Sequence, residues 1–224
     1  MVSEIPEPPP SGPPPAGGPD KVRRRAALLA RRRSLPARLW EAEALQLADR
    51  MSGACALAGG PGMPGDATVC AYVPVPTEPG STAMLDALRA GGRRVLLPVV
   101  PERSGDVGGP GELGWAEYLG PGSLVAGPLG IRRPVGPDLG PSAIGEAALV
   151  LVPALAVDVR GVRLGRGGGW YDRSLPLARA GVASLAVVRD EEVVDELPWE
   201  PHDVPVTGVV TPTAGARLFR PRLD

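Results

Sequence analysis

Predominantly apolar runs of six or seven residues recur along the chain, separated by Gly, Pro or charged residues. Runs of this length without a polar face are typical of strands that are buried on both sides of a sheet. We therefore predict strands at 68–73, 94–100, 147–153 and 183–189, with shorter ones at 113–119 and 207–210.

Segments of helical periodicity lie around these runs. A helix is predicted at 21–33, with Asp20 as its N-cap and with an apolar stripe made of Val22, Ala26 and Leu29. A second helix follows Ser34 and has Pro36 in its first turn. Its buried side is expected to carry Trp40, Ala44, Leu47 and Met51.

Two further helices are predicted at 82–90 and 170–179, each between two of the strands. Strands that alternate with helices favour a parallel sheet that is covered on both faces. The Gly-rich segments 120–142 and 154–169 are expected as connections. We predict one three-layer α/β/α domain over 21–224 with a mainly parallel central sheet.

The first twenty residues have a different composition from the rest. Eight are Pro and three are Gly, with almost no apolar side chains. Such a segment cannot bury enough surface to offset the entropy lost on ordering, so residues 1–20 are expected to be a disordered leader.

The scarcity of certain residue types excludes several chemistries. Lys21 is the single lysine and His202 the single histidine, and Lys21 follows no phosphate-binding glycine loop. Walker A nucleotide sites, protein-kinase sites and zinc sites with two histidines are therefore excluded. The alternative that His202 is merely structural stays open.

Charge and cysteine content place the chain among soluble proteins. The formal net charge is −1, and no apolar run has the length of a membrane span. Cys55 and Cys70 do not form a metal or redox motif and are expected as buried thiols in a reducing compartment. We expect a cytoplasmic monomer that binds small molecules and neither nucleic acid nor a membrane.

The chemistry is concentrated in the segment PALAVDVRGVRLGRGGGWYDR at 153–173. It leaves the carboxyl end of a buried strand, where open α/β sheets bind ligands, and its glycines allow backbone N–H groups to approach a phosphate. Asp172 at the end of this loop can hold Mg²⁺ against phosphate oxygens, although it could instead cap the following helix.

This segment resembles the signature of the 5-formyltetrahydrofolate cyclo-ligase family, also called methenyltetrahydrofolate synthetases. The matching positions are Asp158, Gly161, Arg163, Leu164, Gly165, Gly167, Gly168, Gly169, Tyr171, Asp172 and Arg173, with Trp170 in place of the first aromatic residue. Other family motifs occur in the same order along the chain, at Lys21 and Arg25, Pro74 to Ser81, Gly91 to Val99, Gly130 to Pro134, and Glu200 to Thr211.

The resemblance implies ATP- and Mg²⁺-dependent cyclisation of 5-formyltetrahydrofolate to 5,10-methenyltetrahydrofolate, with release of ADP and phosphate. It implies catalytic roles for Lys21, Arg163 and Asp172, and Mg²⁺ binding by Asp172 with Asp203. ATP would be held by Lys21, Arg25, Gly165, Arg166, Gly167, Gly168, Gly169, Trp170, Tyr171 and Asp172. The folate would be bound by Glu78, Trp115 and Tyr171.

Two other functions stay open from the sequence. Arg24 and Arg133 depart from the family pattern, which would suit a catalytically inactive folate- or nucleotide-binding regulator. Nucleic-acid binding is the second alternative, through the basic residues Arg23, Arg24, Arg25, Arg31, Arg32 and Arg33.

Overall fold

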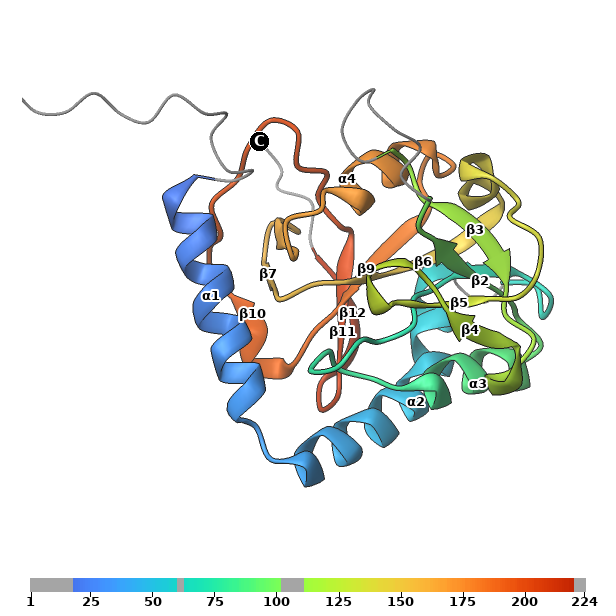
Figure 1. Ribbon diagram of the computed structural model, residues 1–224, viewed down its shortest axis with the longest axis horizontal. Helices are drawn as coiled ribbons and strands as arrows, with labels where there is room; N and C mark the ends of the chain where they lie inside the picture. The colour runs from blue at the N-terminus through green and yellow to red at the C-terminus, as the bar shows by residue number, and fades with distance from the viewer. Residues whose placement is uncertain (1–17, 60–62, 102–110, 220–224) are drawn as a thin grey trace, which may run out of the picture.

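A seven-stranded sheet forms the centre of the domain in the computed structural model, which describes residues 18–59, 63–101 and 111–219 (Figure 1). The strand order is β12-β11-β9-β6-β1-β2-β3. The edge strands β12 and β3 pair antiparallel and the inner strands pair parallel, which confirms the predicted α/β class. The strands are β1 (Thr68–Cys70), β2 (Arg94–Val99), β3 (Gly114–Glu117), β6 (Ala147–Pro153), β9 (Ala183–Val187), β11 (Gly208–Thr211) and β12 (Gly215–Leu218).

Both faces of this sheet are covered, and successive residues of a strand face opposite layers. Val69 and Ala71 pack on the side of helices α2 (Ala37–Gly59) and α3 (Thr82–Ala90), whereas Cys70 packs on the other side. That second layer is thinner, because it contains α4 (Trp170–Ser174) and the 3-10 helices Pro141–Glu146 and Leu175–Leu177. Burial on two sides explains why the strands are continuous apolar runs.

The fourth helix is shorter than the sequence indicates. We predicted 170–179, but α4 ends at Ser174 and a 3-10 turn follows. Pro176 explains the difference, since proline has no backbone N–H and its ring collides with the carbonyl four residues earlier.

Two small sheets lie outside the central one. One has the order β10-β7-β8, and the other pairs β4 with β5 within the segment that we expected as a connection. These strands are too short for a readable period in the sequence, and β12 was missed because its residues do not form an apolar run. Their bounds are β4 (Leu124–Ala126), β5 (Arg132–Pro134), β7 (Ala156–Asp158), β8 (Arg163–Leu164) and β10 (Val193–Val194).

Helix α1 (Pro19–Ser34) lies along one side of the domain, beside β10 (Figure 1). Its start corrects two predictions: Pro19 and Asp20 belong to the helix and not to the leader, and Gly18, not Asp20, is the N-cap. The predicted apolar stripe is also wrong, because Val22 is 44% exposed while Lys21 and Arg32 are buried. The remaining leader, residues 1–17, lies outside the described residues.

None of the described helices has both the length and the apolar character that crossing a membrane would require.

Candidate functional site

A cavity of about 720 Å³ opens at the carboxyl ends of three neighbouring parallel strands. Tyr72 follows β1, Pro98 lies near the end of β2, and Pro153 ends β6. Segments distant in sequence complete the wall: the start of α1, the loop from β8 to α4, and residues 200–203. All predicted site residues except Trp115 line this one cavity.

The glycine loop that leads into α4 has backbone groups available for a ligand. Gly167 has φ of 101° and Gly169 has φ of 63°, a region that side chains other than that of glycine rarely adopt. The N–H groups of residues 166–169 donate to no acceptor in the described part of the chain. A row of such donors facing a cavity is suited to an anion.

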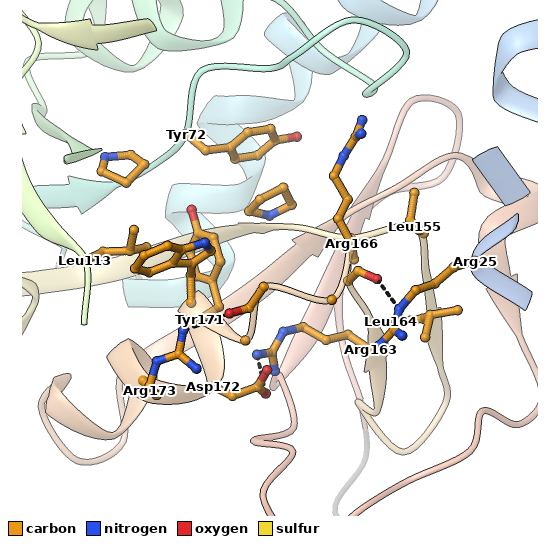
Figure 2. A pocket seen from close by; sticks show the side chains of 18 of the residues that line it. Arg25, Tyr72, Leu113, Leu155, Arg163, Leu164, Arg166, Tyr171, Asp172 and Arg173 are labelled. Carbon is orange, nitrogen blue, oxygen red and sulfur yellow. Dashed lines mark hydrogen bonds and ion pairs between the residues drawn. The ribbon is translucent and has the colours of Figure 1, made fainter. Parts of the chain in front are cut away.

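The first two turns of α1 place two cations at this loop. The Lys21 ammonium donates to Glu200 Oε2 at 2.7 Å and to Asp203 Oδ2 at 2.6 Å. Burial alone would lower the pKa of Lys21, but the hydrogen bonds to the two carboxylates raise it above its ordinary value. Lys21 is therefore fully charged at neutral pH. Arg25 Nε donates to the carbonyl of Gly165 at 3.0 Å, as Figure 2 shows.

Asp172 forms an ion pair inside the cavity (Figure 2). Its Oδ1 accepts from Arg163 Nη2 at 2.6 Å and from the backbone N–H of Val204 at 3.1 Å. The N-cap of α4 is Gly169 and Asp172 lies within the helix, so the alternative of a capping role is wrong. Burial lowers the pKa of Arg163 from its ordinary value. Asp172 Oδ2 accepts no hydrogen bond from the described residues.

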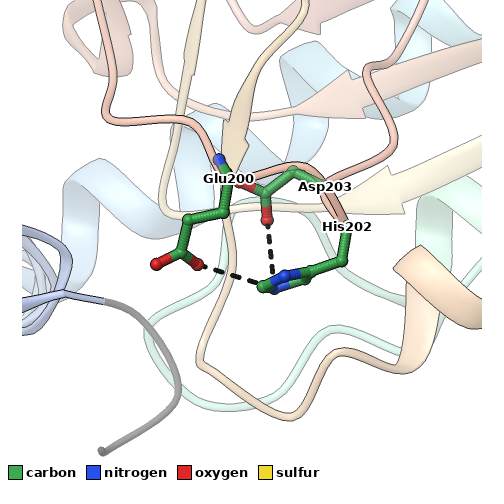
Figure 3. Close-up of side chains that lie close together, drawn as sticks. All are labelled: Glu200, His202 and Asp203. Carbon is green, nitrogen blue, oxygen red and sulfur yellow. Dashed lines mark hydrogen bonds and ion pairs between the residues drawn. The ribbon is translucent and has the colours of Figure 1, made fainter.

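Asp203 belongs to a cluster of possible metal ligands (Figure 3). One ligand atom each of Glu200, His202 and Asp203 lies within 4.8 Å of the others. Lys21 forms ion pairs with both carboxylates, and Asp203 Oδ1 accepts no hydrogen bond from the described residues but lies 3.8 Å from His202 Nε2. Asp203 Oδ1 and Asp172 Oδ2 are oxygens of the type that Mg²⁺ prefers, so the predicted metal ligands fit that ion chemically.

Glu78, Tyr72 and Tyr171 also line the cavity, next to its apolar walls. Glu78 Oε1 accepts from Arg166 Nε at 3.0 Å, and its Oε2 accepts from Val75 N–H at 3.1 Å. The Tyr171 hydroxyl is buried and has no partner among the described residues, and burial raises its pKa. An unsatisfied buried hydroxyl is costly, so it is suited to a polar group of a ligand. The walls here are apolar, with Val100, Leu113 and Ile131.

One predicted site residue, Trp115, departs from this arrangement, and the arginines named for the alternative functions also lie elsewhere. Trp115 does not line the cavity: it is completely buried on β3 and packs in the core, so its predicted folate contact is corrected. Arg24 and Arg133 also lie outside the cavity wall. Arg32, one of the arginines considered for nucleic acid, is buried and paired with Glu192.

Sequence reasoning missed Tyr72 and Glu200 as lining residues. Tyr72 could have been found from its place just after a buried parallel strand, where ligands bind in open sheets. Glu200 stands within the motif that supplied Asp203, but nothing in the spacing shows that it reaches Lys21.

Comparison with known proteins gives a consistent assignment. The model of the 5-formyltetrahydrofolate cyclo-ligase family matches residues 18–212. A 5-formyltetrahydrofolate cyclo-ligase from Mycolicibacterium smegmatis is 51% identical over 84% of this chain and 92% of its own length. The Escherichia coli protein of the same name is 30% identical over 65% of this chain and 78% of its own length.

Solved structures agree with these sequence matches. The 5,10-methenyltetrahydrofolate synthetase of Aquifex aeolicus aligns with a TM-score of 0.66 and 26% identity, over 89% of this chain and 93% of that one. The synthetase of Mycoplasma pneumoniae has a TM-score of 0.61 at 17% identity, over 85% and 97% of the two chains, and so supports the fold alone. With a family model over most of its length and a relative of 51% identity, the chain belongs to the 5-formyltetrahydrofolate cyclo-ligase family.

Proposed function

We propose that this enzyme cyclises 5-formyltetrahydrofolate to 5,10-methenyltetrahydrofolate with ATP and Mg²⁺, and releases ADP and phosphate. One observation carries the proposal: a single cavity joins a glycine loop with free backbone donors to an apolar pocket that holds a buried, unpartnered Tyr171 hydroxyl. A nucleotide bound at the glycine loop and a folate bound in the apolar pocket would then lie in the same cavity, as a reaction between them requires.

The phosphates of ATP belong at the glycine loop. The backbone N–H groups of residues 166–169 are the donors, and Lys21, Arg25 and Arg163 supply positive charge around them. Phosphoryl transfer asks the protein chiefly for positioning and charge neutralisation, and these residues provide both.

Asp172 and Asp203 would hold Mg²⁺ through the carboxylate oxygens that the protein leaves free. Bound Mg²⁺ would neutralise phosphate charge and orient the γ-phosphate. Arg163 and Lys21 hold the two carboxylates in place, since each forms an ion pair of 2.6 Å with one of them.

The folate would occupy the apolar part of the cavity. Glu78 would accept hydrogen bonds from pterin nitrogens, and the Tyr171 ring would pack against a folate ring. In this arrangement the formyl oxygen attacks the γ-phosphorus and ADP leaves. N10 then attacks the formyl carbon, the carbon–oxygen bond breaks, and phosphate leaves with that oxygen while N10 releases its proton.

The test is turnover of the full chain. Incubation with 5-formyltetrahydrofolate, ATP and Mg²⁺ should produce the absorbance of methenyltetrahydrofolate together with equimolar ADP. Asp172→Asn should raise the Mg²⁺ concentration required or abolish turnover. Binding of both ligands without product would contradict the proposal and would favour the inactive regulator.

A further inference from the structure

Four charged side chains form a buried hydrogen-bonded network next to the cavity. Arg32 comes from α1 and Glu43 from α2, whereas Arg189 is the N-cap and Glu192 the last residue of the 3-10 helix Asp190–Glu192. All four side chains are at most 10% exposed, and the two positive charges balance the two negative ones. Nothing in the proposed reaction uses any of them directly.

Hydrogen bonds link the four residues without a gap. Arg32 donates through Nε and Nη2 to the two oxygens of Glu192, both at 2.7 Å. The backbone N–H of Arg189 donates to Glu192 Oε2 at 2.8 Å, and its Nε donates to Glu43 Oε2 at 2.7 Å. Both carboxylates are paired with an arginine, whereas Arg32 Nη1 and Arg189 Nη2 are buried without a hydrogen-bond partner among the described residues.

At one end, this network reaches the turn that carries Glu78. Arg189 Nη1 donates to the carbonyl of Thr77 at 3.3 Å. Thr77 has φ of 77° in a turn closed by the bond from Glu78 N–H to Val75 O at 2.9 Å, a position where glycine is the usual residue. A strained residue persists where its surroundings fix it, and Arg189 supplies such a contact immediately before Glu78.

The other end fixes helix α1 and the wall of the cavity. Arg32 Nη2 also donates to the carbonyl of Ala154, which lines the cavity just after β6. Arg32 lies on the same face of α1 as Lys21 and Arg25, eleven and seven residues further along the helix. Holding Arg32 therefore sets the position of the two cations at the glycine loop.

We propose that Arg189 and Arg32 are positioning residues for the two halves of the site: Arg189 orients the Glu78 turn toward the folate, and Arg32 orients the Lys21 end of α1 toward ATP. This inference rests on the proposed function for the identity of the two ligands. A merely structural role would change the amount of folded enzyme and would leave the ratio of the two KM values unaltered.

The experiment compares Arg189→Lys with Arg32→Lys in the full chain. Lysine keeps the charge but cannot make the divergent hydrogen bonds of a guanidinium. Arg189→Lys should raise the KM for 5-formyltetrahydrofolate about tenfold and leave the KM for ATP within about twofold, as expected for a residue that orients a ligand-contacting group. Arg32→Lys should give the opposite pattern.

The matched control is Arg94→Lys. Arg94 is also ion-paired with two carboxylates, Glu117 and Glu146, but it starts β2 at the end away from the cavity. Both KM values should equal those of the unaltered chain. Glu43→Gln is the milder second variant, should Arg189→Lys fold poorly, and it should shift the folate KM in the same direction.

A readout without ligands separates this inference from the proposed function. Amide hydrogen exchange at Glu78 should accelerate in Arg189→Lys and stay unchanged in Arg32→Lys. If the unaltered chain shows no turnover, the proposed function fails and exchange still decides the positioning role. Equal shifts of both KM values in both variants, or unchanged exchange at Glu78, would overturn the inference.

Discussion

Helices α1 and α2 follow each other in the chain but dock on the domain in opposite ways. Helix α2 buries Leu47, Met51 and Ala54 against the central sheet, in the hydrophobic core. Helix α1 buries Lys21 and Arg32, which are paired with carboxylates of the segment 192–203.

The difference follows from what each helix covers. Helix α2 lies on a sheet face and buries mainly apolar side chains there, with Glu43 as its buried charged residue, paired with Arg189. Helix α1 lies on segments that present carbonyls and carboxylates, and its inward face carries the cations Lys21 and Arg32 with Leu28 packed between them on a small apolar cluster. An amphipathic pattern therefore identifies a buried face only when the partner is apolar. In α1, the cations that dock the helix also place positive charge at the ligand site.

The largest expected effect is on stability, at the apolar interface of α2. Leu47→Ala should lower the free energy of unfolding by about 2–5 kcal/mol, because it removes a completely buried side chain and leaves a cavity. Urea unfolding measures the loss. Leu45→Ala on the exposed side of the same helix is the control, with a change within about 0.5 kcal/mol. An equal cost at the two positions would contradict the comparison.

The next effect is on activity, at the charged interface of α1. Lys21→Met should lower kcat/KM for ATP by about 10²–10³, since it removes a fixed charge where phosphate charge develops. Steady-state kinetics at varied ATP measure this loss, while thermal unfolding should show a domain that is still folded.

Arg23→Met is the matched control for that variant. Arg23 lies two residues away on the same helix, with its side chain 80% exposed and Asp20 at 3.7 Å as its one ion-pair partner in the described part of the chain. Its kinetics should equal those of the unaltered enzyme. If Lys21→Met retained full ATP kinetics, Lys21 would be a docking residue only.

The same contrast explains which parts of the fold were predictable from the sequence. Helix α3 was placed at both of its ends, because Ser81 caps it through the Ala83 N–H and Gly91 ends it. The central strands were found because burial on both faces leaves apolar runs such as β6. These signals are local, so they can be recognised in the sequence without knowledge of tertiary contacts.

The features that were predicted wrongly depend on partners that are distant in the sequence. The inward face of α1 is set by Glu192 and Glu200, some 160 to 180 residues away, and no spacing in the sequence connects them with Lys21 or Arg32. Trp115 was taken for a ligand contact because an aromatic residue suits a folate ring, whereas its place in the sheet directs it into the core. The glycine loop was predictable because its backbone chemistry is contained in one segment.

A smaller, pH-dependent effect should separate the two helices. The hydrogen bond from Lys21 is the main cause that lowers the pKa of Glu200 from its ordinary value of 4.5. A lowered folded-state pKa stabilises the fold above the unfolded value, and this contribution is lost as the pH falls below about 4.5. After correction for the intrinsic exchange rate at each pH, protection in residues 18–34 should then fall relative to protection in residues 37–59 on going from pH 7 to pH 4. An equal fall in protection in both helices would contradict docking of α1 by charge.

The smallest effect concerns the apolar stripe that the sequence assigned to α1. Val22 is 44% exposed, so Val22→Ala should change the free energy of unfolding by less than about 0.5 kcal/mol. Leu28 is the matched position, because it is half-buried against the cluster of Ala156, Val162, Leu164 and Leu197, and Leu28→Ala should cost about 1 kcal/mol. Alanine is a better helix former than leucine and still more so than valine, so the difference measured by urea unfolding reports docking together with this gain in helix propensity. An equal or larger cost at Val22 would restore the apolar stripe as the buried face and would leave the burial of Lys21 and Arg32 without its explanation.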